Sequence, residues 1–318
     1  MRNFKSLFLI SFLLVSVALN SALNYLLIPN NVMRMKMHNL ETSSYEDLFL
    51  GTSHGLSAVD PAVVDEITGR QSSNLCVWSE YPRDSYYLLK NAIRFQKPTR
   101  VIYELDPTYW LNKDQDTYHS TKLYHYMSWS WVKVEYFFAK ILSTDFRIAL
   151  FPWFNYQLQW QASLENLALK QTDNYRNFGL ETFDLPYEVL KENGFLYLKD
   201  TKANKSKNMT LWDEAKLQPD ALRFFQNIVT YCRENHIELV VFTAPVSKET
   251  LELNPESFQA ANRYFTDLMN HYNLRYYNFN FIELEGFDKS LAGFTDYDGH
   301  MLGETARSFS KHLGEYLK

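Results

Sequence analysis

Two stretches that lie far apart in the chain carry side chains suited to acyl transfer. The first is 48-LFLGTSHGLSAVDP-61, in which an apolar run ends shortly before Ser53. The second is 294-FTDYDGHMLGETA-306, in which His300 stands close to Asp296 and Asp298. A histidine can take the proton of a serine hydroxyl while a carboxylate orients the imidazole ring. The residue types therefore predict a Ser-His-Asp site, provided that the fold brings the two stretches together.

Each of these residues also has a simpler interpretation when it is taken alone. Ser53 has a type that is preferred at the N-cap of a helix, and His300 fits an exposed position at a helix start. The pairing of the two stretches favours the catalytic interpretation for both. We expect His54, the neighbour of the serine, to point away from the site. Glu104 and Asp106 follow another apolar run and would either touch a substrate or cap the next segment.

The serine must be held at the end of a strand if it is to act as a nucleophile. Short apolar runs predict strands at 48–50, 74–78, 100–105, 237–246 and 274–279. Helical spacing separates them at 61–68, 85–95, 219–236, 256–272 and 302–317. This alternation predicts βαβ units on a central parallel sheet. Ligands collect at the carboxyl ends of the strands in such a sheet, so both stretches should meet there.

An aromatic-rich segment interrupts the alternation at about residues 107–215. It holds most of the tryptophans of the chain and shows little regular alternation, so we expect a mostly helical insertion. Its aromatic side chains have three interpretations. They would form a core of their own, a carbohydrate-stacking wall over the site, or a surface that packs against a membrane or a membrane partner.

The N-terminus contains the charge-free run 7-LFLISFLLVSVALNSALNYLLI-28, which is 22 residues long. This length is sufficient to cross a hydrocarbon layer of about 30 Å. Asn20-Ser21-Ala22 makes a poor cleavage site, so we expect residues 1–28 to be an uncleaved signal anchor. A cleaved signal peptide and a buried helix are the alternatives.

The flanking charges predict how the chain is oriented. Arg2 and Lys5 favour a cytoplasmic N-terminus, with the bulk of the chain extracytoplasmic in a single-pass arrangement, whereas Arg34 and Lys36 oppose it. The mixed, polar residues 29–46 are expected to form a stalk, and residues 47–318 the main domain.

Composition excludes several classes of function. The net charge is −5 and basic residues form no block, so we expect no nucleic-acid partner. Cys76 and Cys232 stand in no metal or redox spacing and are expected to be buried free thiols. His119 and His125 have no third ligand in view, so we expect neither a metal nor another cofactor.

Four segments together resemble the SGNH (GDSL-like) hydrolase superfamily. They are LFLGTSHGLSAVDP, TGRQSSNLCVWSEYPRDSYYLLKNAIRFQKPTRVIYEL, IELVVFTAPV and FTDYDGHMLGETARSFSKHL, and they cover about residues 45–110 and 220–318. Their order is most similar to a membrane-anchored bacterial branch that includes the D-alanyl transfer protein DltD and alginate O-acetylation proteins. The resemblance implies a flavodoxin-like three-layer α/β/α fold.

The resemblance also implies roles for individual residues. Ser53 matches the nucleophile and His300 the general base. The acid of the family stands three residues before the histidine, where this chain has Tyr297, so Asp296 and Asp298 both remain candidates. Asn74 would support the site.

One departure from the family concerns the oxyanion hole. The usual glycine after the second strand is absent, and no Gly-x-Asn-Asp follows the third strand. The N–H of Ser53 and a loop N–H near Ser79 would then have to hold the oxyanion.

The implied function is that of an extracytoplasmic serine O-acyltransferase or esterase acting on a cell-surface polysaccharide or teichoic-type polymer. Relatives often work beside a multi-spanning membrane O-acyltransferase, so such a partner is expected by analogy. The missing glycine and the altered Asp-x-x-His spacing support an alternative. In it, the chain is a non-catalytic accessory subunit that binds the polymer or the membrane partner.

Overall fold

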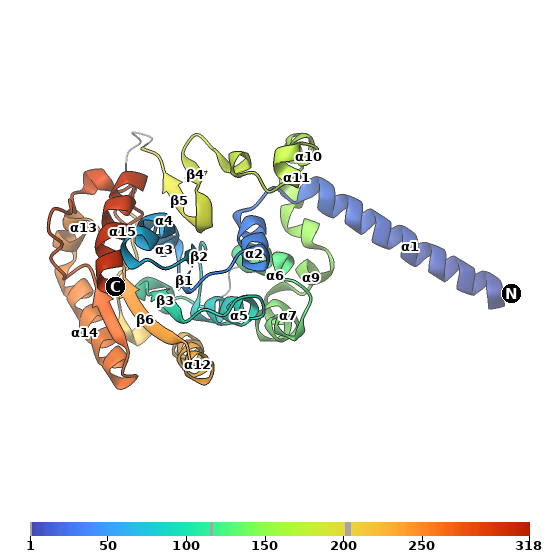
Figure 1. Ribbon diagram of the computed structural model, residues 1–318. Coiled ribbons are helices and arrows are strands. Elements are labelled where there is room, and N and C mark those ends of the chain that lie inside the picture. Colours follow the sequence, from blue (N-terminus) through green and yellow to red (C-terminus); the bar gives the residue numbers. More distant parts are fainter. Residues whose placement is uncertain (1, 115–116, 201–204) are drawn as a thin grey trace.

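The computed structural model describes residues 2–114, 117–200 and 205–318 (Figure 1). Five parallel strands form its central sheet in the order β2, β1, β3, β6, β7. Their bounds are Ser72–Asn74, Asp47–Leu50, Arg100–Glu104, Glu238–Thr243 and Arg275–Asn278. Counted along these five strands alone, the order is 2-1-3-4-5, which is that of flavodoxin-like folds. The predicted fold class is thus confirmed.

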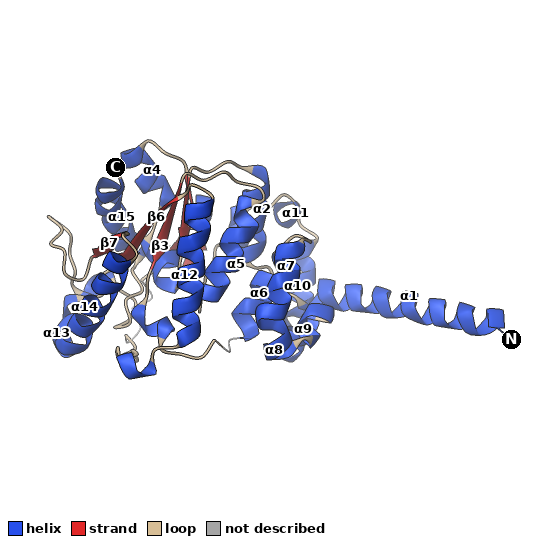
Figure 2. Cartoon of the chain, turned by 90° about the horizontal axis from the view of Figure 1, so that it is seen from below, coloured by secondary structure: helices blue, strands red, loops and turns tan. Residues whose placement is uncertain are grey.

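Helices cover both faces of this sheet (Figure 2). One face carries α3 (Ser53–Ala58), α4 (Pro61–Thr68) and α15 (Gly303–Leu317). The other carries α5 (Pro82–Ile93), α12 (Pro219–Glu234) and α14 (Pro255–His271), and α13 (Lys248–Leu253) precedes α14.

The strands supply both cores because successive side chains point to opposite faces. In β1, Leu48 and Leu50 join the core under α5 and α12, while Phe49 joins the core under α4 and α15. The same alternation in β6 sends Val241 to the first core and Phe242 to the second.

The insertion is helical over most of its length and contains a β-hairpin toward its C-terminal end. Its helices are η1 (Pro107–Trp110), α6 (Thr117–Tyr126), α7 (Trp131–Tyr136), the π-helical η2 (Phe137–Ile141), α8 (Leu142–Asp145), α9 (Arg147–Leu150), η3 (Pro152–Ala162), α10 (Ser163–Lys170), α11 (Asp173–Arg176) and η4 (Leu180–Phe183). The hairpin, which the sequence analysis did not predict, pairs β4 (Glu188–Leu190) with β5 (Leu196–Leu198). Short 3-10 turns lie at η5 (Glu192–Gly194), η6 (Glu214–Lys216) and η7 (Leu291–Gly293).

The N-terminal helix α1 (Arg2–Leu27) projects from one end of the molecule (Figure 1). Its segment Lys5–Leu27 is long and apolar enough to cross a membrane, and its side chains from Lys5 to Leu19 are exposed.

The expectation of a stalk over residues 29–46 is wrong. These residues include α2 (Val32–Thr42), whose Met33, Met37 and Leu40 belong to the main core. The sequence misled because α2 mixes apolar side chains with Arg34, Lys36 and His38, and Lys36 is itself buried.

Candidate active site

Ser53 lies where β1 turns into α3. Thr52 is the N-cap of this helix, because its side chain accepts a hydrogen bond from the N–H of His54 at 3.2 Å. Ser53 is therefore the first residue of the helix and not its cap. Its own N–H has no acceptor within the helix, since the first N–H groups of a helix never do. Because Thr52 caps the helix, the hydroxyl of Ser53 is not used as a helix cap.

Gly51 makes the sharp turn before the serine possible. Its φ of 148° is one that side chains rarely adopt, and a Cβ there would lie 2.6 Å from the Cβ of Glu104. A glycine is needed because the ends of β1 and β3 approach so closely. Glu104 then accepts hydrogen bonds from the N–H and the hydroxyl of Thr52, both at 2.8 Å, which fixes the turn.

The fold brings Ser53, His300 and Asp296 into one hydrogen-bonded row. The Nε2 of His300 lies 2.9 Å from the Oγ of Ser53. On the other side of the ring, Nδ1 lies 2.8 Å from Oδ2 of Asp296. Both distances are within the range for a nucleophile, its base and the group that orients the base. This geometry is that of a Ser-His-Asp triad.

The loop around Asp296 explains its unusual spacing from the histidine. Oδ1 of Asp296 accepts the backbone N–H groups of Gly299 and His300 at 2.9 and 3.2 Å, leaving Oδ2 for the ring. Gly299 has a φ of 122°, and a Cβ there would lie 2.9 Å from Val246. Asp296 stands four residues before His300, one more than in the family. The loop accommodates the additional residue because glycine tolerates this conformation.

The charge state of Asp296 suits the orienting role. Burial alone would raise its pKa, but the hydrogen bond and charge of His300, together with the two backbone N–H groups, hold that pKa well below the usual range. The carboxylate therefore stays ionised at neutral pH and can stabilise an imidazolium.

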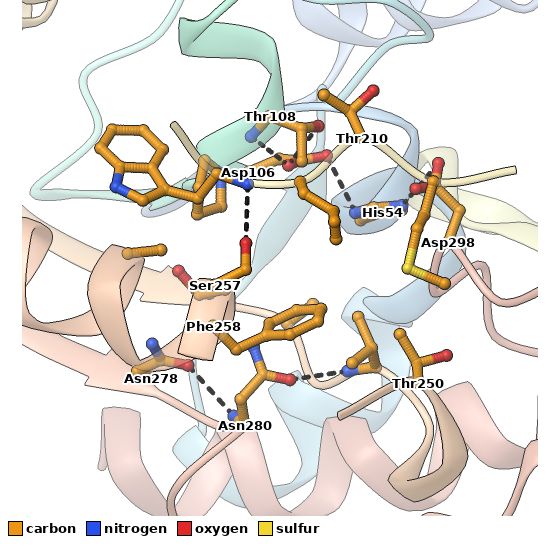
Figure 3. A pocket seen from close by; sticks show the side chains of 18 of the residues that line it. His54, Asp106, Thr108, Thr210, Thr250, Ser257, Phe258, Asn278, Asn280 and Asp298 are labelled. Atoms are coloured by element: carbon orange, nitrogen blue, oxygen red, sulfur yellow. Dashed lines mark hydrogen bonds and ion pairs between the residues drawn. The ribbon is translucent and has the colours of Figure 1, made fainter. Parts of the chain in front are cut away.

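Asp298 does not contact the ring nitrogen of His300 that Asp296 occupies. Its Oδ2 instead lies 3.8 Å from Nε2 of His54, whose Nδ1 is 3.1 Å from Asp106 (Figure 3). The expectation that His54 points away from the site is wrong, since its ring lies edge-on to that of His300 with 4.7 Å between centroids. His54 thus lies between two carboxylates and beside the ring of His300.

The electrostatics of this cluster favour a protonated His54. Burial acts to lower the pKa of His54, but the charge and hydrogen bond of Asp106, supported by Asp298, outweigh it and raise that pKa well above 6.5. Burial also raises the pKa of Glu104 to about 7, although the charge of His54 opposes this shift. Asp106 additionally caps η1 through the N–H of Thr108, so its capping role is met as well.

The two predicted support residues occupy different places. Asn74 donates to the carbonyls of Gly55 and Val59, both at 2.9 Å, so it holds the far end of α3 and not the serine itself. Ser79 lies on the loop after β2 with a positive φ of 50°. Ser79 and Ser53 both lie close enough to the hydroxyl of Tyr109 to influence its pKa, which brings this loop near the site.

Tyr109 is the site residue that sequence reasoning missed. Burial and the nearby charge of Asp106 raise its pKa, so the phenol keeps its proton and can donate a hydrogen bond. Nothing in the sequence around PTYW distinguished this tyrosine from the many others of the insertion. Only its position just after β3 offered a signal, because that strand also ends at the active edge of the sheet.

A pocket opens beside His54, and residues of α14, such as Ser257 and Phe258, form part of its lining (Figure 3). Its empty volume, which includes open solvent at the mouth, is about 610 Å³. Hydroxyl and amide side chains alternate with apolar ones along its wall, among them Thr108, Thr210, Ser257, Asn280, Trp212 and Phe258. His54 and Asp298 belong to this wall and so join the pocket to the triad.

His54, Asp298 and His300 also present donor atoms within 4.8 Å of one another, an arrangement that merits comparison with a metal site. Both ring nitrogens of His300 already face Ser53 and Asp296, and His54 faces two carboxylates. Hydrogen bonding and ion pairing therefore account for these contacts.

Comparisons with known proteins add little beyond the fold. No family model and no curated protein matches the chain. Among solved structures, it is similar to a protein assigned to the G-D-S-L lipolytic family from Desulfitobacterium hafniense. The identity is 9%, the TM-score is 0.40, and the match covers 85% of this chain and 98% of the other.

Proposed function

We propose that this protein is a serine acyl-transfer enzyme, an esterase or O-acyltransferase. The observation that carries the proposal is the row formed by Ser53, His300 and Asp296, with 2.9 and 2.8 Å between successive side chains. The resemblance of the surrounding segments to SGNH (GDSL-like) hydrolases supports the same reaction class.

In the proposed reaction, the Oγ of Ser53 attacks the carbonyl carbon of an acyl ester while its proton passes to Nε2 of His300. The tetrahedral intermediate collapses, the bond to the leaving alkoxide breaks, and His300 returns the proton to that oxygen. Water or an acceptor hydroxyl then gives its proton to His300 and attacks the acyl-serine. The bond between the acyl carbon and Oγ of Ser53 breaks, and His300 returns the proton to that oxygen. Asp296 stays ionised and stabilises the imidazolium in both halves.

The oxyanion of the intermediate needs donors in place of the glycine that the family normally supplies. We expect two of them to be the N–H of Ser53, which begins α3, and the hydroxyl of Tyr109, which lies near the serine. Such donors are worth most when they are fixed in advance in a site shielded from water.

The expected substrate remains a cell-surface polysaccharide or a teichoic-type polymer. The pocket beside His54 suits a sugar unit, because Trp212 and Phe258 offer apolar faces next to hydroxyl and amide groups. Within this proposal, the chain is membrane-anchored with its bulk outside the cytoplasm, and a multi-spanning O-acyltransferase is the expected source of acyl groups.

A fluorophosphonate probe tests the proposal, because it labels only an activated serine. Full-length protein in detergent should be labelled, and Ser53→Ala should lose the label. Ser57→Ala is the matched control and should keep it. Ser57 is equally buried on α3, and its hydroxyl only bonds the carbonyl of Ser53 one turn back, a contact of little energetic value.

Two results would overturn the catalytic role. One is the absence of labelling in a well-folded wild type. The other is normal function of Ser53→Ala in cells. Together they would favour the alternative of a non-catalytic accessory subunit.

A further inference from the structure

The segment 148-IALFPWFNYQLQWQASL-164 is the part of the insertion that packs against α1. It comprises the end of α9, all of η3 and the start of α10, and it contains no Asp, Glu, Lys or Arg. Buried Tyr156 packs with Leu27 and Ile28 at the end of α1. The segment therefore packs against the C-terminal part of the N-terminal helix. We call residues 148–164 the collar.

Hydrogen bonds fix the collar at a definite height along α1. Asn20 donates to the carbonyl of Leu150 at 3.0 Å and accepts from the indole N–H of Trp153 at 2.9 Å. Asn24 accepts the backbone N–H of Trp153 at 3.0 Å. These two asparagines are polar residues in a predominantly apolar helix, and such residues in membrane spans normally find partners on neighbouring segments. The collar supplies those partners.

The position of these contacts sets the depth of the collar. The candidate span Lys5–Leu27 has 23 residues and is therefore about 35 Å long, slightly more than a hydrocarbon layer of about 30 Å. Asn20 lies seven residues before Leu27, which corresponds to roughly 10 Å along the helix. The collar therefore lies beside the last two turns of the candidate span. With Lys5–Leu27 across a bilayer, it would lie near the boundary between acyl chains and headgroups.

Large apolar side chains of the collar are exposed, with the exposed Gln157, Gln159 and Gln161 between them. Leu158 is 90% exposed, Leu164 75%, Trp160 63% and Leu150 58%. Side chains of this kind on the surface of a folded domain mark a contact with another apolar phase. Figures 1 and 2 both show α9 and α10 at the end of the molecule from which α1 leaves.

We propose that the collar is a second membrane-binding element, which lies in the interfacial region of the bilayer beside α1. The occupant of its apolar face is lipid, because the face is continuous with the candidate transmembrane helix and carries no charge. Tryptophan and tyrosine are the residues enriched at this depth. The proposal rests on α1 crossing a bilayer and does not depend on the catalytic proposal.

Depth-dependent quenching tests the proposal on the full chain, reconstituted as single copies in lipid nanodiscs. Leu158→Cys carries an environment-sensitive fluorophore on the collar. Val15→Cys reports on the middle of α1, and Leu253→Cys on α13 reports on the opposite end of the molecule. All three side chains are exposed. The natural thiols should not react, since burial raises the pKa of Cys232 to about 12 and that of Cys76 well above 9.

The expected pattern has three parts. The label at position 158 is quenched by spin-labelled lipid and shielded from aqueous iodide, and its emission is shifted to the blue. The label at 15 behaves in the same way, and the label at 253 is quenched by iodide alone. Iodide quenching at 158 equal to that at 253 would overturn the proposal and leave a protein partner as the occupant. Water exposure at 15 would overturn the anchor and the collar together.

Discussion

The two neighbouring aspartates of the C-terminal loop have different tasks. Asp296 faces the ring of His300 and is held by two backbone N–H groups, whereas Asp298 faces His54 and the pocket. A single intervening residue, Tyr297, separates them, so the difference arises from the path of the loop and not from the residue type. The catalytic contribution should therefore differ sharply between them.

Asp296→Asn should slow acylation by about 10³–10⁴-fold, because the amide no longer orients the imidazole or stabilises its charged form. Asp298→Asn is the matched control and should lose far less, since the triad contacts remain. The measurement is the rate of fluorophosphonate labelling of both variants and of the wild type. Equal losses in the two variants would show that Asp296 has no special role.

At the scale of elements, α2 supports the active edge of the sheet. Nζ of Lys36 donates to the carbonyls of Asn74 and Cys76 at 2.6 and 2.7 Å, just where the chain leaves β2 toward Ser79. Burial lowers the pKa of Lys36 to about 7, against a smaller opposing influence of Cys76. This helix thus holds the segment that leads from β2 toward Ser79.

Replacing Lys36 by Met should destabilise the protein by about 2 kcal/mol at pH 10, because two buried carbonyls lose their donor. Between pH 7 and 10.5 the unfolded chain binds a proton at this lysine that the native protein does not, so wild-type stability rises with pH there. The unfolding free energy of the wild type minus that of Lys36→Met should accordingly fall from pH 10 to pH 7. Urea unfolding in detergent measures it.

Lys216→Met provides the control for this pH dependence, because Lys216 is exposed on η6. Its unfolding free energy should follow that of the wild type at every pH. If the unfolding free energy of the wild type minus that of Lys36→Met increased as the pH fell, this would contradict the assigned direction of the pKa shift.

At the scale of the whole molecule, His54 joins three distant parts of the chain. It follows β1, Asp106 follows β3, and Asp298 belongs to the loop before α15. Glu104 adds a fourth ionisable group through Thr52. One imidazolium thus neutralises carboxylates that the fold gathers from both halves of the sequence.

His54→Gln should cost about 3–5 kcal/mol of unfolding free energy at pH 6, because it leaves the buried Asp106 without its cation. The folded pKa of His54 is raised, so its stabilisation is complete below pH 6.5 and is lost as the pH rises through that folded value. The difference from wild type should therefore shrink at alkaline pH. Denaturant titrations at several pH values would show it, and a difference that grew with pH would refute this account.

Asp298→Asn is also the control for this prediction, because Asp298 faces His54 but is less buried than Asp106. The side chain of Asp298 is 36% exposed, so its loss should cost less than about 1 kcal/mol.

The sequence alone determined the sheet, most of its helices and the segments of the candidate site. Short apolar runs such as 237–246 are local signals of burial, and they predict strands without reference to the rest of the chain. Ser53 could be named because it follows a predicted strand, and His300 because it precedes a predicted helix. The expectation of a membrane anchor rests in the same way on the length of one apolar run.

Only the tertiary structure decided which side chains meet. Asp296 reaches His300 because Gly299 adopts a positive φ against Val246, and no periodicity encodes that. His54 contacts Asp106, and Tyr109 lies near Ser53, because neighbouring strands bring these segments side by side. The burial of α2 and the position of the collar are long-range packing as well. Such contacts join residues far apart in the chain, so local patterns cannot reveal them.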